Sequence, residues 1–333
     1  GSDNTFVGDE AGGATTTGSN NVAIGSGAAD ANTTGAQNTA VGEGSLTTNS
    51  TGSHNTALGR SALYNATTAD YNTAVGSGAM YAATTGTQNV AVGRDALNDI
   101  TTGSYSVAVG YQALDAQTTA SNNTAVGWEA GSATTTGASN TFIGQNSGAS
   151  NTTASFNTAV GALSFDANST GASNTAVGYL ALSANTTAGN NVAVGTNALQ
   201  SNTTGSENTA VGTEALYSNT TAANNTALGY YALRTNSTGA NNVAVGFGAL
   251  DANTTADNNT AVGYSALSAN TTGTNNTAVG KQAGTSITTG NTNTAVGKGA
   301  LQSNSTNSAN TAVGNDALTN NTAANNTAVG KDA

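Results

Sequence analysis

The sequence predicts an all-β fold, a parallel β-solenoid of about twenty coils with one 17-residue repeat per coil. The motif Asn-Thr-Ala-Val-Gly, seen at residues 38–42, recurs in that form or a close variant twenty times, from Asn4 to Asn326. Every step is seventeen residues except the last, which is sixteen because one threonine is missing near Thr322. Within the motif β-branched or apolar residues recur with a period of two, which indicates one short strand in each coil.

We expect residues 1–333 to form a single uncapped repeat array of nineteen inter-motif steps, without separate domains. At the usual strand spacing of ~4.8 Å, twenty coils would extend for about 95 Å. The first three residues are already in register with the repeat and no capping unit is visible. The chain is therefore expected to be a window cut from a longer protein or a subunit that stacks end to end.

Composition excludes several classes of function. The chain has no cysteine, and its seventeen acidic and six basic residues give a net charge of -11. This charge argues against nucleic acid as a partner, because nucleic-acid binding depends on neutralising phosphates with basic residues. No apolar run approaches the ~20 residues of a membrane helix, so we expect no membrane insertion. The apolar residues stand at fixed places in the repeat, which favours order over disorder.

Numbering each repeat from the asparagine of its motif defines seventeen columns. Column 5 is glycine in all twenty copies and is interpreted as a turn glycine, as at Gly42, Gly59, Gly76 and Gly212. Column 4 is always Val, Ile or Leu, and column 9 is usually Leu. We expect columns 2 and 4 to point inward with column 9, which gives a predicted structural core that includes Val41, Leu58, Val75, Val92, Val211 and Leu97.

Column 3 then lies on the opposite face of the strand. It is alanine in all copies except Phe6 and Phe142, although a free surface would vary more. One coil also buries few large aliphatic side chains for the seventeen residues it orders. Both points predict several chains packed side by side, preferably a homotrimer, with an inter-chain face that contains Ala40, Ala57, Ala74 and Ala210.

The remaining columns are predicted to hold ladders and solvent positions. Asparagine dominates column 12 and threonine fills column 14 of every full-length repeat, so stacked copies of these side chains are expected to bond from coil to coil. All charged residues fall in columns 6, 7, 10, 11, 16 or 17, which are therefore predicted to face solvent.

The pattern Asn-(Thr/Val)-Ala-(Val/Ile)-Gly, then Ala-Leu and Asn-Thr-Thr-Gly, resembles two related groups of repeats. One is the head repeat of trimeric autotransporter adhesins, whose Asn-Ser-Val-Ala-Ile-Gly signature is similar to residues 21–25. The other is the repeat shaft of phage and marine bacterial tail-fibre-like proteins. The resemblance spans essentially the whole chain, although the adhesin repeat is usually shorter than seventeen residues. It implies a trimer of parallel β-solenoids, with columns 2 and 4 inward, that acts as a shaft or adhesive head.

No catalytic, cofactor-binding or metal-binding residue is predicted, and the protein is not expected to be an enzyme. The one histidine, His54, falls in a solvent column, and the acidic residues form no repeated pair. Tyr230, Phe247 and Tyr264 occupy column 6 of consecutive repeats and predict an exposed aromatic ladder. Such a ladder would be a platform for sugar rings or a partner, or a self-stacking row that adds stability; the second is favoured.

The function expected from these features is that of a structural fibre or filament segment, extracellular on a cell surface or a virion. Its expected partners are further copies of itself, as a homotrimer or an end-to-end filament, and a cell-surface or glycan ligand. The alternative is an ice-binding solenoid that uses a threonine ladder. Column 14 supplies a row of threonines and column 13 is nearly all Thr or Ser, but neighbouring strand residues point to opposite faces, so only one of these columns could be outward.

Overall fold

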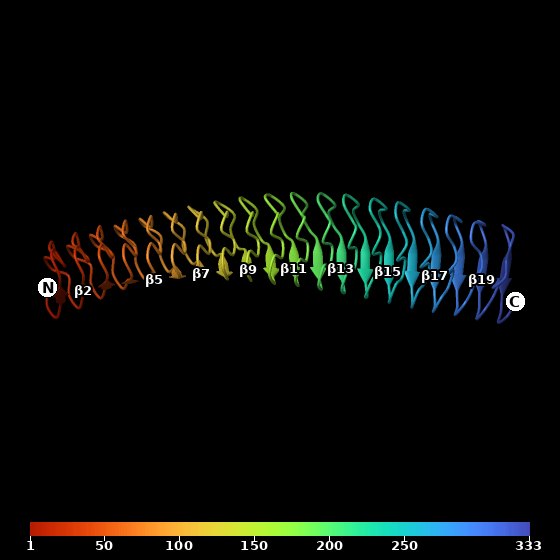
Figure 1. The fold of residues 1–333 in the computed structure, drawn as a ribbon, viewed down its shortest axis with the longest axis horizontal. Helices are drawn as coiled ribbons and strands as arrows, with labels where there is room; N and C mark the ends of the chain where they lie inside the picture. Colours follow the sequence, from red (N-terminus) through yellow and green to blue (C-terminus); the bar gives the residue numbers. More distant parts are fainter. The chain divides into compact units, whose positions relative to one another are not determined.

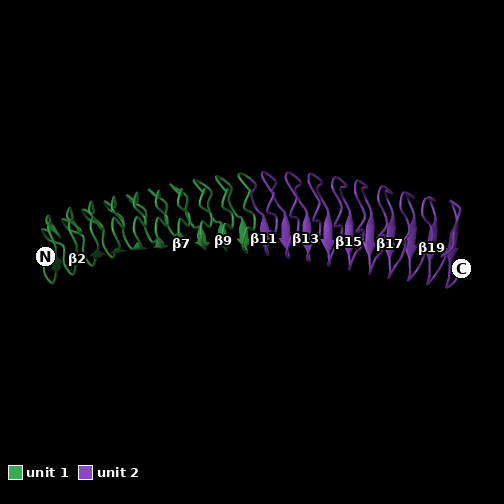
Figure 2. Ribbon diagram, viewed as in Figure 1, with its two compact units in different colours: residues 1–170 green, residues 171–333 purple.

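The computed structural model describes all of residues 1–333, and it is an all-β parallel β-solenoid without helices. Twenty three-residue strands recur at the 17-residue spacing, which confirms the predicted fold class and period. The chain divides into two compact units, residues 1–170 and 171–333, each with ten strands (Figures 1 and 2). The structure contains no helix long and apolar enough to cross a membrane.

Each strand consists of columns 2 to 4 of its coil. The strands of the first unit are β1 (Thr5–Val7), β2 (Val22–Ile24), β3 (Thr39–Val41), β4 (Thr56–Leu58), β5 (Thr73–Val75), β6 (Val90–Val92), β7 (Val107–Val109), β8 (Thr124–Val126), β9 (Thr141–Ile143) and β10 (Thr158–Val160). Those of the second unit are β11 (Thr175–Val177), β12 (Val192–Val194), β13 (Thr209–Val211), β14 (Thr226–Leu228), β15 (Val243–Val245), β16 (Thr260–Val262), β17 (Thr277–Val279), β18 (Thr294–Val296), β19 (Thr311–Val313) and β20 (Thr327–Val329).

Within each unit, every strand pairs in parallel with the next one along the chain, as the arrows of Figure 1 show. The register is column on column, so Ala40 of β3 stands opposite Ala57 of β4 and Ala210 of β13 opposite Ala227 of β14. Other columns also bond between coils, for example Leu46 N–H to the carbonyl of Ala62 and Thr33 N–H to that of Ser50. Each unit therefore grows along one axis, by ~4.8 Å per coil.

The strand faces are the reverse of the predicted ones. Column 3 is buried inside the chain's own core, with Ala40, Ala57, Ala74 and Ala210 all at 0% exposure, so these alanines do not form an inter-chain face.

Column 4 points outward. Leu58 is 46% and Val92 37% exposed, and Val41, Val75 and Val211 are half-buried, so these five residues are not core residues. Of the predicted core only Leu97, in column 9, is fully buried. The physical reason is space. A 17-residue coil encloses a thin interior, in which the column 9 leucine leaves room for little more than a methyl group on the strand.

Exceptions to the repeat show how tightly this interior is filled. Phe142 replaces the column 3 alanine of its coil and is fully buried. The column 9 residues beside it are Gly131 and Gly148, where an added Cβ would lie 2.6 and 2.4 Å from the phenyl ring. At Gly284 the missing leucine is replaced instead by Ile287 of column 12, whose Cδ1 lies 3.0 Å from the place of a Cβ. Core volume is thus conserved within each neighbourhood rather than at each column.

The column 5 glycines confirm their predicted role as turn residues. Gly42 has a φ of 133°, and an added Cβ would lie 2.6 Å from the carbonyl oxygen of Gly59 in the next coil. Gly59, Gly76 and Gly212 share this conformation. The left-handed positions in columns 7, 9 and 17 do accept side chains, including leucine at Leu97 with a φ of 50°. Glycine is required at column 5 because both the dihedral angle and the neighbouring backbone exclude a Cβ.

We therefore predict that Gly42→Ala lowers stability by more than about 2 kcal/mol, since it combines backbone strain with a steric clash. Gly44→Ala in the same coil is the matched control. Gly44 has a φ of 64°, and a Cβ added there would lie 3.4 Å from the ring of Tyr64, its nearest neighbour. Its cost should stay at about 1 kcal/mol. Thermal unfolding of both variants measures the difference, and equal effects would contradict this account of column 5.

A second prediction concerns Gly284 and Ile287. Gly284→Leu alone should be destabilising because the new side chain meets Ile287, and Ile287→Asn alone because it leaves space unfilled. The double variant restores the Leu–Asn pair found in the preceding coil at Leu267 and Asn270. It also gives the buried, unpaired Oδ1 of Asn270 a donor. A double-mutant cycle should show a favourable coupling of about 1–3 kcal/mol, whereas additive losses would refute the shared-volume explanation.

Candidate functional site

The outward columns of the strands form the first candidate surface. We define the sheet face as the side chains of columns 2 and 4 on β1–β10 in the first unit and on β11–β20 in the second. Column 4 is aliphatic in every coil, and column 2 is threonine in fifteen coils and valine in five. No charged residue occupies either column. Each unit therefore carries an uncharged, regularly repeated surface that is half aliphatic.

The column 2 threonine hydroxyls are free on this face. Thr39, Thr56 and Thr209 are partly exposed, and none of the column 2 threonines donates a side-chain hydrogen bond within the chain. In column 13, by contrast, hydroxyls are used internally, as in Thr33 Oγ1 to the carbonyl of Ser50 at 2.8 Å and Thr203 Oγ1 to that of Thr220 at 3.0 Å. The column 14 threonines are exposed and do not form the coil-to-coil ladder that the sequence suggested.

The second candidate surface is column 6, on the turn after each strand. The predicted aromatic ladder is present: the ring of Phe247 stacks on Tyr230 at 5.4 Å and on Tyr264 at 5.3 Å between centroids, with interplanar angles of 13° and 9°. All three rings are 42–50% exposed. Because the rings face one another, only their edges and hydroxyl groups meet solvent. This geometry favours the self-stacking interpretation over a platform on which sugar rings would lie flat.

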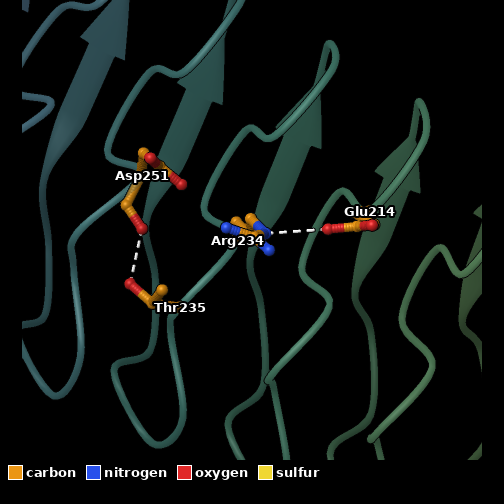
Figure 3. Close-up of polar contacts among 4 residues, drawn as sticks. All are labelled: Glu214, Arg234, Thr235 and Asp251. Atoms are coloured by element: carbon orange, nitrogen blue, oxygen red, sulfur yellow. Dashed lines mark hydrogen bonds and ion pairs between the residues drawn. The ribbon is translucent and has the colours of Figure 1, made fainter.

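Three charged side chains, Glu214, Arg234 and Asp251, lie in neighbouring coils, as Figure 3 shows. Arg234 Nε donates to Glu214 Oε2 of the preceding coil at 2.8 Å, and its guanidinium lies 4.5 Å from the centroid of Tyr231. Thr235 donates its hydroxyl to the backbone carbonyl of Asp251 in the following coil (Figure 3). Burial raises the pKa of the Asp251 carboxyl, while the charge of Arg234 opposes that shift. These contacts tie three neighbouring coils together.

Lys281 and Lys298 continue column 6 in the two coils after Tyr264. The ammonium of Lys281 lies 5.7 Å from the centroid of Tyr264. Neither lysine forms an ion pair, whereas Arg94, Arg234 and Lys331 each do. From the sequence alone these lysines are expected to be ordinary solvent residues, like all the charged residues of the chain. The signal that singles them out is that column 6 holds five of the six basic residues of the chain, Arg60, Arg94, Lys281, Lys298 and Lys331.

Other titratable groups do not converge on one place. His54, in column 17, stacks on Tyr71 with 4.6 Å between centroids and is exposed. No group of three or more His, Cys, Asp or Glu side chains is arranged to hold a metal ion. No family model matches the chain, and a search of curated proteins gave no match.

Asp115 is the carboxyl group with the largest resolved shift. Partial burial, reinforced by the negative charges of Asp99, Asp95 and Glu129, raises its pKa to about 6. The folded state therefore holds this proton more tightly than the unfolded state, whose carboxyl titrates near 3.8. The stability that this proton provides is complete below pH ~4 and is lost as the pH rises through about 6.

We predict that Asp115→Asn raises the thermal unfolding midpoint at pH 7, because it removes an ionised, partly buried carboxylate from among like charges. At pH 3.5 the wild-type carboxyl is protonated in the folded state and mostly protonated in the unfolded state, so the two proteins should melt at nearly the same temperature. Melting curves across pH 3.5–7 test this. A constant difference at all pH values would contradict the assigned titration.

Proposed function

We propose that the chain is a non-catalytic segment, shaft or head, of a fibre exposed on a cell or virion surface, in which three copies pack side by side through their sheet faces. The observation that carries the proposal is the sheet face itself. Every coil of both units presents an aliphatic side chain and a β-branched neighbour to the outside, and no coil places a charge there. A surface that is uncharged in every coil is typical of one that binds another surface.

The size of the face supports association between copies. Ten strands spaced by ~4.8 Å, each three residues wide, cover roughly 480 Å² in one unit. The face of each unit is thus more than half of the ~800 Å² that a stable protein interface covers on each partner, so contact through the faces of both units reaches that size. Because every coil repeats the same columns, a second copy offers the same aliphatic row at the same spacing, so copies are self-complementary along their length.

The number of copies rests on the resemblance of the repeat to trimeric adhesin heads. That resemblance implied columns 2 and 4 inward, whereas column 3 fills the interior of each chain and columns 2 and 4 lie outside, so we propose the sheet face as the contact between copies. The column 2 exchange between threonine and valine supports this contact. The two side chains share a β-branched shape, so a packed surface accepts either one where the hydroxyl is not essential.

A second function is favoured by one specific observation, the free hydroxyls of column 2. In consecutive coils they stand ~4.8 Å apart beside an aliphatic row about 6.8 Å away, two residues along the strand. A regular array of hydroxyl and methyl groups of this kind suits an ice-binding surface. Of the two columns considered for this role from the sequence, column 13 has its hydroxyls bonded to the next coil, whereas the column 14 threonines are exposed.

Light scattering separates the two functions. The fibre proposal predicts a species of three chains, each of 32.1 kDa. Replacing Val75 and Val211 together by lysine should shift that species toward single chains, because charges would be buried between the copies. Gln88→Lys with Asn224→Lys, on exposed column 17, is the matched control and should leave the mass unchanged. A wild-type monomer that slows ice recrystallisation at micromolar concentration would overturn the fibre proposal in favour of ice binding.

A further inference from the structure

The distribution of charge along the second unit is uneven. Residues 259–309, three consecutive coils, contain Lys281 and Lys298 and no acidic residue, although the chain as a whole carries seventeen acids and six bases. The nearest acidic residues in the sequence are Asp257 before this segment and Asp316 after it. Asp316 borders this segment in the next coil, where its backbone N–H donates to the carbonyl of Lys298 at 2.8 Å, so Lys281 is the lysine that lies within the acid-free coils.

The two lysines lie at the end of the aromatic ladder. We call Tyr230, Phe247, Tyr264, Lys281 and Lys298 the column 6 stripe; they occupy the same turn position in five consecutive coils. Both lysines are exposed, and the ammonium group of Lys298 forms no hydrogen bond, ion pair or ring contact. Like charges at the same position of neighbouring strands repel one another, so this arrangement is unfavourable until an anion approaches it.

The aromatic part of the stripe also favours an anionic partner. Its ring faces are covered by their neighbours, so the edges are what a partner meets. The edge of an aromatic ring carries partial positive charge, and the hydroxyl of Tyr264 can donate a hydrogen bond, whereas that of Tyr230 is already bonded to Tyr231. The side chains beside the stripe, Ser265 and Gln282 in column 7, are polar and uncharged. Every exposed group of the stripe is thus suited to an anionic partner that is also rich in hydroxyl groups.

We propose that the column 6 stripe binds a linear acidic polysaccharide, with sugar carboxylates at Lys281 and Lys298 and sugar hydroxyls along the tyrosine edges. This inference rests on the proposed function, since a surface fibre meets such polymers, and it names the ligand class of that fibre. The stripe is only one side chain wide, so its area is far smaller than the ~800 Å² that a stable protein partner covers. A linear polymer fits this shape.

The other linear polyanions fit less well. Nucleic acid carries one charge per ~1.7 Å of duplex, which two lysines do not neutralise on a chain with a net charge of -11. An extended acidic peptide places side chains on one side every ~6.8 Å, out of step with coils spaced by ~4.8 Å. A sugar ring is close in size to one coil, so successive rings can follow successive coils.

The test is calorimetric titration of the whole chain, at low ionic strength, with alginate oligosaccharides, which are linear polymers of uronic acids. Wild-type protein should bind them, and Lys281→Ala with Lys298→Ala should weaken binding about tenfold or more, the scale expected when two charge-assisted contacts are lost. Arg60→Ala with Lys331→Ala is the matched control. It removes two cations from the same column outside the acid-free segment, and it should leave the affinity unchanged.

Three results would overturn the inference: no binding of alginate by the wild type, an equal loss in the control variant, or equal affinity for poly-glutamate. Neutral dextran should not bind. Light scattering on the same samples keeps the two proposals apart. A three-chain species that ignores alginate refutes the polysaccharide site and leaves the fibre in place, whereas a monomer that binds alginate through the lysines refutes the fibre alone.

Discussion

The buried asparagine of column 1 is the interaction on which the rest of the structure depends. Asn208 accepts a hydrogen bond on Oδ1 from the backbone N–H of Asn225 in the next coil, at 3.0 Å. It donates through Nδ2 to the carbonyl of Ala222, fourteen residues further on, at 2.8 Å. One amide thus closes its own coil and fixes the position of the next. An apolar side chain of the same size could do neither, and it would leave buried backbone groups unpaired at about 1–3 kcal/mol each.

The one coil that lacks this asparagine supports the same conclusion. Ser106 stands in column 1 and is too short to span the coil. Gln117, in column 12 of the same coil, replaces the missing amide, because its Nε2 donates to Ser106 Oγ at 3.0 Å and to the carbonyl of Ala120 at 3.1 Å. Its Oε1 accepts from Asn123 Nδ2 at 2.8 Å. A substitution in column 1 is thus accompanied by a change that restores the hydrogen bonds, much as Phe142 accompanies the glycines of column 9.

The period, the position of the strands and the need for glycine at Gly42 could all be predicted from the sequence, because each follows from local rules that repeat in every coil. The direction of the strand faces could not. Val41 and Ala40 alternate in either orientation, and a column of valines looks like a core whether it packs inside one chain or against another. What decides is the width of the interior, which depends on how Leu97 and its equivalents in column 9 fold back under the strand. That packing is tertiary information.

The candidate surfaces, too, could be predicted from the sequence only in part. The stack of Tyr230, Phe247 and Tyr264 was predictable, because stacking in register follows directly from the period. The orientation of the rings, with their edges rather than their faces toward solvent, could be seen only in the three-dimensional structure. Lys281 and Lys298 were visible in the sequence but had no meaning until the structure showed that they continue the aromatic row and pair with no acid. In this fold the interior is fixed by closure of the coil, and the outward columns are free to acquire partners.

The most direct test of the central role of column 1 is the hydrogen exchange of asparagine side-chain amides, followed by NMR on protein labelled with ¹⁵N-asparagine. The Nδ2 protons of buried column 1 residues such as Asn208 should exchange only when their coils unfold, because both the carbonyl partner and the surrounding core exclude water. Those of exposed column 17 residues such as Asn224 should exchange at the rate of a free amide. Equal, rapid exchange in the two columns would contradict the account.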